Sequence, residues 1–466
     1  MKRILLILFS SILLVSCQDD LDDKIFPADR LYINNFIWNA MNLFYFYNSE
    51  VPDLGDERFS SNEEFSDFLS NFEAPEDLFD HLLIPTDRFS IIVSDFRVLE
   101  SALQGTRVDS GMRFGLFAVE GSDRVFGFVR YVLPNSPAEQ AGITRGLLFD
   151  RVNGQTLTQS SNFNQLFSGN SIQIGIAEFD EEELVSLDQQ YILQQIELTE
   201  NPIHKVEILD FPEKKVGYLM YTNFRRNFEQ ELNQVFAMFQ SENIDELVLD
   251  LRYNGGGDLQ VAVNLCSMIT GQFFNELLAT RETNDNFEDV PIFFSNETIG
   301  GQSLNSLQLS RVYVLTSRTT ASASELVISG LQPFINLVQI GRQTSGKYQG
   351  STTLYDSPNF GRQNASLAHR YALQPLIFKL VNSVGFTDYD EGIEPSINIG
   401  EQIVDAQALG SPTEALLREA LLDMGIQIPG RGFYFHSNND FDLVGENFMH
   451  ATDYQRMYDK IDLLSE

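Results

Sequence analysis

The sequence of 466 residues predicts a multidomain α/β protein. Three observations lead to this expectation. The pattern is helical and rich in aromatic residues over 31–98, and it shortens to strands and turns over 99–200. From 201 to 425 strands and helices alternate, which is typical of an α/β layer. The polar, acidic segment 426–466 carries no pattern from which a role can be assigned.

The first 16 residues predict a targeting segment. Lys2 and Arg3 precede the apolar run Ile4–Val15, which is too short to span a bilayer comfortably. The run ends in Leu-Val-Ser-Cys at 14–17, which resembles the lipobox of bacterial lipoproteins. This resemblance implies cleavage after residue 16, lipidation of Cys17 and an acidic tether over 17–30. It also implies a bacterial cell envelope protein, periplasmic or surface-exposed, that meets the membrane through its lipid anchor only.

Composition excludes several classes of function. The chain has 31 basic and 66 acidic residues, a net charge of −35, and no run of Lys or Arg longer than a pair, so no nucleic-acid partner is expected. Cys266 lies in an apolar stretch and is expected to be a buried hydrophobe. The five histidines are scattered singly, so neither a metal site nor a cofactor site is predicted.

The segment 31–98 is expected to form a small helical N-terminal domain. Phe65, Phe68, Leu69 and Phe72 recur at helical spacing, and Ser61–Glu64 is typical of a capping box that opens this helix. No residue pattern in this segment indicates a catalytic site.

The segment 99–200 contains a short helix between turns. In Ser136–Ile143 a Pro opens the helix and a Gly follows it, and an Asn-Gly turn comes at 153–154. This stretch resembles a PDZ domain, although Leu147 stands where that family usually has Asp. The resemblance implies that Phe114, Gly115 and Leu116 bind an extended peptide as an added strand and hold its terminal carboxylate. A module that serves only packing is the alternative.

Two segments of the α/β region have several readings each. Asp250–Gly257 follows a strand and contains three glycines, which could bring backbone N–H groups close to a ligand or simply make a tight turn. Thr319–Glu325 opens an apolar helix, where Ser322 with Glu325 forms a capping box. The same position puts the Ser322 hydroxyl beside free N–H groups, which favour a developing negative charge.

A third segment, Gly341–Lys347, contains most of a phosphate-binding loop. Tyr348 follows the lysine where that motif needs Ser or Thr, and a turn and strand follow instead of a helix, so a nucleotide site is disfavoured.

Together the three segments resemble the carboxyl-terminal processing, or tail-specific, serine peptidases. Lys347 comes 25 residues after Ser322, and Ala372–Pro375 and Gly392–Pro395 resemble that family's closing strands. The resemblance implies an α/β core of the crotonase/ClpP type with a PDZ-like domain. It also implies that Ser322 is the nucleophile, Lys347 the general base, and the N–H groups of Ala323 and Gly256 the oxyanion hole.

The implied function is a serine endopeptidase that cleaves polypeptides near free C-termini through an acyl-enzyme. A lysine can act as the base if burial keeps it neutral, which predicts an apolar pocket around Lys347. Many members have a Gln four residues after the lysine, where this chain has Ser351; Gln349 or Gln374 could replace it. The alternatives are a catalytically silent peptide-binding lipoprotein of the same fold and a purely structural lipoprotein.

Overall fold

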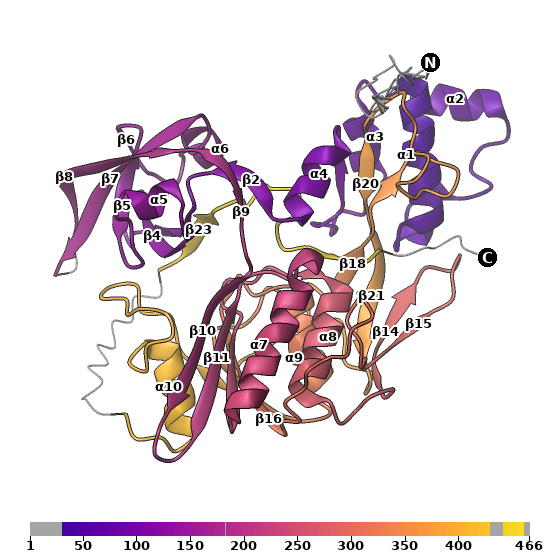
Figure 1. Cartoon of the computed structure of the whole chain (residues 1–466). Coiled ribbons are helices and arrows are strands. Elements are labelled where there is room, and N and C mark those ends of the chain that lie inside the picture. Colours follow the sequence, from indigo (N-terminus) through magenta and orange to yellow (C-terminus); the bar gives the residue numbers. More distant parts are fainter. Residues whose placement is uncertain (1–29, 182, 429–440, 461–466) are drawn as a thin grey trace, which may run out of the picture.

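The computed structural model describes residues 30–181, 183–428 and 441–460. Figure 1 shows three regions: N-terminal helices, a β-rich domain on the opposite side, and an α/β core below and between them. The chain is therefore a multidomain α/β protein, as predicted. In the described ranges no helix is both long and apolar enough to cross a membrane. The predicted targeting segment and Cys17 lie outside the described residues.

The N-terminal region consists of short helices that pack on the α/β core. Helix α2 begins after Ser61, whose hydroxyl accepts a hydrogen bond from the N–H of Glu64 at 3.2 Å, which is half of the predicted capping box. The Glu64 carboxylate accepts from the N–H of Ser60 at 2.9 Å instead of from that of Ser61. The buried side chains of α1 belong to the same apolar core as those of the central sheet, so this region does not have a core of its own. The elements are α1 (Arg30–Phe44), η2 (Asn48–Glu50), η3 (Pro52–Leu54), α2 (Asn62–Ser70), α3 (Pro75–His81) and α4 (Phe96–Leu103).

A small sheet joins this region to the later chain. Strand β1 (Ile91–Val93) pairs with β20 (Ala372–Gln374), which also pairs with β19 (Leu354–Tyr355). The segment Ala372–Gln374 is thus a strand, as expected. Gly392–Pro395 is not: Gly392 has a φ of +95°, Pro395 has no N–H to donate, and strand β22 begins only at Ile397.

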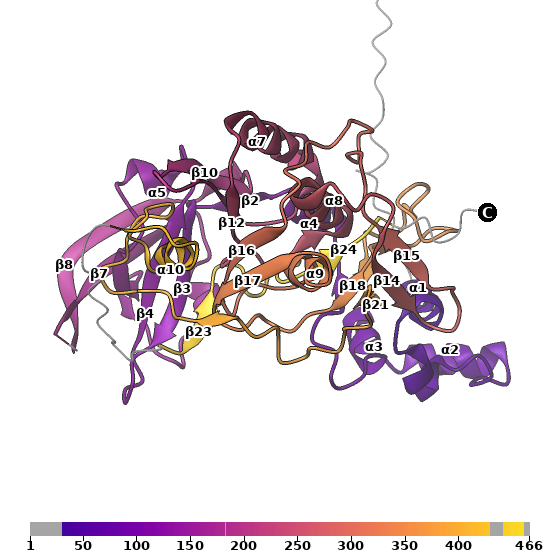
Figure 2. The same ribbon diagram turned by 90° about the horizontal axis from the view of Figure 1, so that it is seen from below.

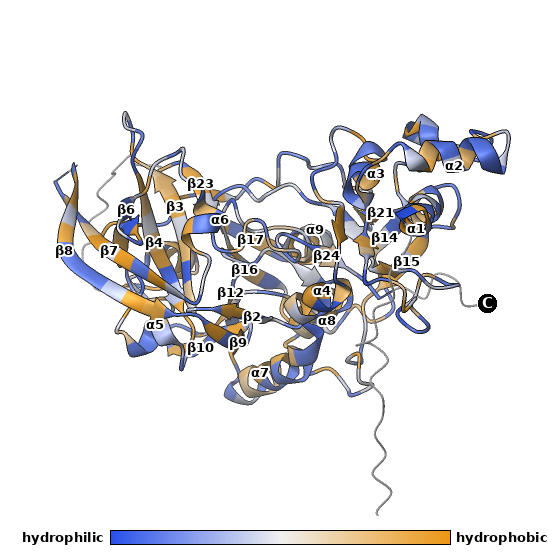
Figure 3. Cartoon of the chain, turned by 90° about the horizontal axis from the view of Figure 1, so that it is seen from above, coloured by the Kyte–Doolittle hydropathy of each residue, from blue (hydrophilic) through white to orange (hydrophobic). Residues whose placement is uncertain are grey.

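The β-rich domain is built on one sheet of order β23-β3-β4-β5-β7-β8, with β6 beside β5. The short helix after Ser136 and the Asn-Gly turn at 153–154 form as predicted. Hydrophobic residues are frequent on the inner strands, whereas much of edge strand β8 is hydrophilic (Figure 3). The elements are β3 (Met112–Ala118), β4 (Val125–Val132), α5 (Pro137–Gln140), β5 (Leu148–Val152), β6 (Gln155–Thr156), α6 (Phe163–Leu166), β7 (Ser171–Asp180), β8 (Glu183–Gln194) and β23 (Leu443–Glu446). A two-stranded sheet, β2 (Thr106–Asp109) with β9 (Ile196–Thr199), connects this domain to the core.

The central sheet of the core has the order β10-β11-β12-β16-β17-β22 and is parallel from β11 onward. Helices α7, α8 and α9 cover one face, and α10 covers the other, so the core has three layers. Strands and helices alternate along this region, as predicted. The elements are β10 (Ile203–Asp210), β11 (Lys215–Tyr221), η4 (Arg226–Phe228), α7 (Glu229–Glu242), β12 (Glu246–Asp250), α8 (Leu259–Thr270), β16 (Arg311–Thr316), α9 (Ala323–Leu331), β17 (Asn336–Gly341), β22 (Ile397–Asn398) and α10 (Ala415–Asp423).

A second sheet lies beside the first and includes β24, a strand of the last described segment. Its order is β13-β24-β18-β21-β14-β15. The elements are β13 (Gly257–Asp258), β14 (Leu277–Thr283), β15 (Val290–Phe293), β18 (Gln349–Ser351), β21 (Leu376–Asn382) and β24 (Met457–Tyr458). Figure 2 shows β24 near α9 and β18 at the centre of the molecule, while β23 lies with the β-rich domain.

Candidate active site

The three loops singled out in the sequence meet at one edge of the central sheet. Strands β12, β16 and β17 are neighbours and run parallel, and each loop follows the carboxyl end of one of them. Ligand sites of open α/β sheets lie at this edge. Segments about 100 residues apart in sequence are therefore brought side by side.

Hydrogen bonds connect these loops directly. The carbonyl oxygen of Asn254 accepts hydrogen bonds from the Ser324 hydroxyl at 3.0 Å and from the N–H of Ala321 at 3.1 Å. The N–H of Ser345 donates to the carbonyl oxygen of Thr320 at 2.9 Å. The glycine loop, the serine loop and the lysine loop thus form one connected unit.

Ser322 is fully buried at the N-terminus of α9. Its φ of +67° and ψ of −117° lie in a region that residues with a Cβ rarely adopt. Half of the predicted capping box is present, because Glu325 Oε2 accepts a hydrogen bond from the Ser322 N–H at 2.6 Å. The other half is absent: the Ser322 hydroxyl has no hydrogen-bond partner among the described residues. The serine is therefore not held in place by capping with its side chain.

Lys347 is completely buried. Burial, with a smaller contribution from the positive charge of Arg456, lowers the pKa of the Lys347 ammonium well below its ordinary value. Nζ lies 4.5 Å from the centre of the Phe89 ring and donates a hydrogen bond to the carbonyl oxygen of Gln455 at 2.8 Å. The predicted apolar environment is thus partly present, but Nζ and the Ser322 hydroxyl are not hydrogen-bonded to each other in the described structure.

Glu325 links the two loops that carry Ser322 and Lys347. Its Oε2 accepts from the N–H groups of both residues, at 2.6 and 2.9 Å. Its Oε1 accepts from the Gly346 N–H at 2.8 Å and from the Thr344 hydroxyl at 2.5 Å. Burial raises the pKa of the Glu325 carboxyl, while these four donors oppose the rise. The sequence indicated only the capping contact, since the contacts with 344–347 depend on tertiary structure.

The predicted oxyanion residues lie beside Ser322. Ala323 is the first residue of α9, directly at the positive end of the helix dipole. A Cβ on Gly256 would lie 2.7 Å from the Ser322 Cβ, so only glycine fits there. However, the Gly256 N–H donates a hydrogen bond to Asn254 Oδ1 at 2.9 Å, so it is not free in this structure.

None of the three side chains considered as orienting groups for Lys347 contacts its amino group. Ser351 Oγ donates to the carbonyl oxygen of Met457 at 3.2 Å. Gln349 Nε2 donates to the Tyr47 hydroxyl. Gln374 Nε2 donates to Thr353 Oγ1. The Phe89 ring and the Gln455 carbonyl take this place, and neither was indicated by the sequence.

The predicted peptide-binding residues Phe114, Gly115 and Leu116 lie on β3 in the β-rich domain, and Phe114 lines the same cavity as Gly255 of the glycine loop and Thr319 of the serine loop. The edge of β3 that they form is paired with β23. Cys266 is buried, as expected. In the part of the chain that the structure describes, no cluster of His, Cys, Asp or Glu side chains is arranged to hold a metal ion.

Comparison with known proteins identifies the family. The model for "Peptidase family S41" matches residues 215–399, and that for "Peptidase S41 N-terminal domain" matches residues 32–91, together more than half of the chain. An Arabidopsis thaliana chloroplastic carboxyl-terminal-processing peptidase 2 is 23% identical over 263 residues, 54% of this chain and 48% of that protein. A Picosynechococcus carboxyl-terminal-processing protease is 30% identical over 134 residues, 29% of this chain and 30% of that protein. These matches span less than half of the length of either relative.

A solved structure extends the likeness to most of the fold. A Bacteroides fragilis chain assigned to the S41 proteases superimposes with a TM-score of 0.65 and 27% identity, covering 84% of this chain and 97% of the other. The match to the family model over residues 215–399 includes the serine and lysine loops. This chain therefore belongs to peptidase family S41.

Proposed function

We propose that this protein is a serine endopeptidase that cleaves polypeptides near their C-termini with a Ser322–Lys347 dyad. The observation that carries the proposal is the pair of buried groups joined through Glu325: a serine hydroxyl without a partner and a lysine whose pKa burial lowers. The names of the relatives, carboxyl-terminal-processing proteases, support the substrate class.

The chemistry requires neutral Lys347. Its amine accepts the Ser322 proton as Oγ attacks the substrate carbonyl carbon, and the oxyanion forms at the N-terminus of α9 beside the Ala323 N–H. The C–N bond then breaks, the amine leaves with the proton, and water hydrolyses the acyl-enzyme. Gly256 can join as a second donor only if its N–H leaves Asn254 Oδ1.

We assign capture of the substrate tail to the edge of β3 at Phe114, Gly115 and Leu116, in a PDZ-like role for residues 99–200. The reasons are that this edge of β3 pairs in antiparallel register with an extended segment, β23, and that the short helices α5 and α6 belong to the same domain. We further propose the crotonase/ClpP type for the core over 201–425 and a lipid anchor at Cys17 that holds the enzyme in the cell envelope. The N-terminal helical region 31–98 is assigned a structural role.

The test is peptide cleavage by the chain from residue 24 onward. Ser322→Ala and Lys347→Ala are expected to reduce the rate at least a thousandfold, because each removes one partner of the dyad. Lys205→Ala, which changes an exposed lysine paired with Glu207, serves as the matched control and should leave the rate unchanged. Cleavage that survives Ser322→Ala contradicts the proposal, and binding of peptides without any cleavage favours the silent peptide-binding alternative.

A further inference from the structure

The last described segment, residues 441–460, runs from the β-rich domain to the serine and lysine loops. Strand β23 adds to the edge of β3 in antiparallel register, with Gly445 opposite Leu116 and Glu446 opposite Gly115. The Asn447 side chain continues this contact: its Oδ1 accepts from the Phe114 N–H and its Nδ2 donates to the Met112 carbonyl at 3.0 Å. The geometry is that of a peptide bound by strand addition.

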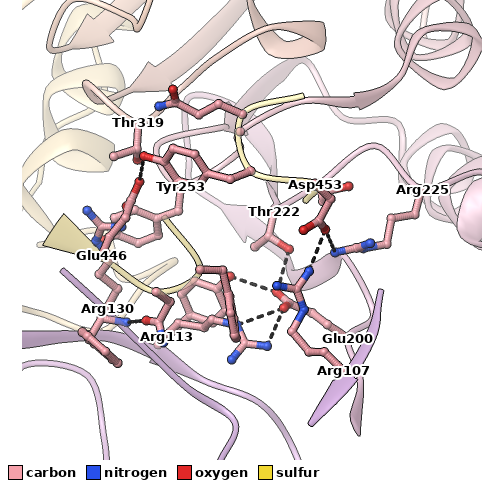
Figure 4. Close-up of a pocket in the computed structure, with 18 residues that line it drawn as sticks. Arg107, Arg113, Arg130, Glu200, Thr222, Arg225, Tyr253, Thr319, Glu446 and Asp453 are labelled. Atoms are coloured by element: carbon pink, nitrogen blue, oxygen red, sulfur yellow. Dashed lines mark hydrogen bonds and ion pairs between the residues drawn. The ribbon is translucent and has the colours of Figure 1, made fainter. Parts of the chain in front are cut away.

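A cavity of about 110 Å³ between the β-rich domain, the core and this segment is lined by arginines (Figure 4). Carboxylates of the segment pair with them. Glu446 forms an ion pair with Arg130, and Asp453 pairs with Arg107 at 2.6 Å and lies 3.9 Å from Arg225. These side chains are all largely buried. Removal of the segment would leave the buried guanidinium groups of these arginines without their carboxylate partners, and an unpaired buried charge destabilises the folded protein.

The segment then passes the dyad. The Gln455 carbonyl accepts the hydrogen bond of Lys347 Nζ at 2.8 Å. The Arg456 carbonyl oxygen lies 2.9 Å from the point where a Cβ on Gly256 would stand, and Ser322 Oγ lies 3.1 Å from the same point. Beyond it, β24 pairs with β13 and with Ser351 of β18. The main chain of Gln455 and Arg456 therefore lies beside the nucleophile and the lysine.

We propose that residues 443–458 are an internal pseudosubstrate that occupies the peptide-binding edge and the position beside the Ser322–Lys347 dyad together and keeps the enzyme latent. The inference rests on the peptidase function proposed above. Because the Lys347 amine is hydrogen-bonded to the Gln455 carbonyl and not to the Ser322 hydroxyl, this segment is bound as an inhibitor rather than as a substrate. A polypeptide substrate has to displace it, and the arginines favour substrates with carboxylates at the matching positions.

A binding experiment tests the inference without relying on catalysis. The probe is a fluorescent peptide with the sequence of residues 441–458, added to Ser322→Ala chains that begin at residue 24. A chain ending at residue 442 is expected to bind the probe at least tenfold more tightly than the chain ending at 466, because the internal segment no longer competes. Equal affinity of the two chains overturns the inference.

A cleavage experiment with intact Ser322 adds the functional readout. The chain ending at 442 is expected to cleave peptides at least tenfold faster than the full chain, and the 441–458 peptide added in trans should restore inhibition. If neither chain cleaves peptides, the proposed peptidase function is wrong. The binding experiment then still shows whether residues 443–458 occupy the peptide-binding edge. If the full chain cut off its own segment 443–458 in a Ser322-dependent reaction, the segment would be bound as a substrate, and the proposed inhibition would be wrong.

Point variants in the full chain cover the case in which truncation impairs folding. Glu446→Gln with Asp453→Asn removes the ion pairs to Arg130 and Arg107, and it is expected to raise probe binding and the cleavage rate several-fold. Met449→Ala changes an exposed side chain of the same segment and serves as the matched control. Equal behaviour of the double variant and the control, with both folded by circular dichroism, overturns the inference.

Discussion

The carboxylate of Glu325 offers the sharpest test of how the site is held together. Its two oxygens accept hydrogen bonds from four donors: three backbone N–H groups, those of Ser322, Gly346 and Lys347, and the Thr344 hydroxyl. In Glu325→Gln one oxygen is replaced by an NH₂ group, which cannot accept. Whichever way the amide is turned, two of the four donors lose their acceptor inside a buried site.

The magnitude follows from these contacts. A hydrogen bond to a charged group contributes about 1.5–3 kcal/mol, so two lost bonds cost about 3–6 kcal/mol. Burial raises the pKa of Glu325, and the neutral amide avoids that desolvation, so we expect the lower end of the range. For a domain of the size of the core over 201–425, Tm falls by about 2–4 °C per kcal/mol, so the Tm of Glu325→Gln should be lower by at least about 6 °C.

The assay is thermal unfolding followed by circular dichroism, with peptide cleavage as a second readout. Cleavage should fall about a hundredfold, because both loops of the dyad lose a common acceptor and shift. Glu63→Gln is the matched control, since Glu63 lies in the first turn of α2 and is exposed. A Tm of Glu325→Gln within 2 °C of both the wild type and this control refutes the reasoning.

Three further variants follow from the site. Ser322→Gly should be about 1 kcal/mol more stable to urea than Ser322→Ala, because glycine relieves the strain of the positive φ; equal stabilities would contradict a strained nucleophile. Lys347→Met should be more stable than wild type at neutral pH, since the buried lysine has a lowered pKa. At pH values between the lowered pKa of Lys347 and the ordinary lysine pKa, the unfolded state binds one proton more than the folded state, so the stability of the wild type rises with pH. The stability advantage of Lys347→Met therefore shrinks by about 1.4 kcal/mol per pH unit. A stability difference that does not change with pH would count against a neutral lysine. Arg252→Met should cost about 3–5 kcal/mol in urea unfolding, because it leaves the buried Asp250 and Glu414 carboxylates without their cation, and a loss under 1 kcal/mol would exclude that role.

Local chemistry made much of this protein predictable from its sequence. Helix α2 with its Ser61 cap, the short helix after Ser136 and the parallel strands of the core all follow from periodicity, capping and turn residues that act over a few positions. The three candidate loops were also identifiable, because each combines glycines or a serine with a strand end. Only the resemblance to a peptidase family related these loops to one another.

The tertiary structure decided what no local pattern carries. Glu325 reaches the lysine loop because β16 and β17 are neighbours in the sheet, which is a matter of strand order. The partner of Lys347 is the backbone carbonyl of Gln455, and a carbonyl has no side-chain signature in a sequence. The same holds for β23 on the edge of β3, since strand addition uses main-chain groups that every residue possesses. The sequence by itself thus determined the nucleophile and base candidates, whereas packing between distant segments decided what touches them.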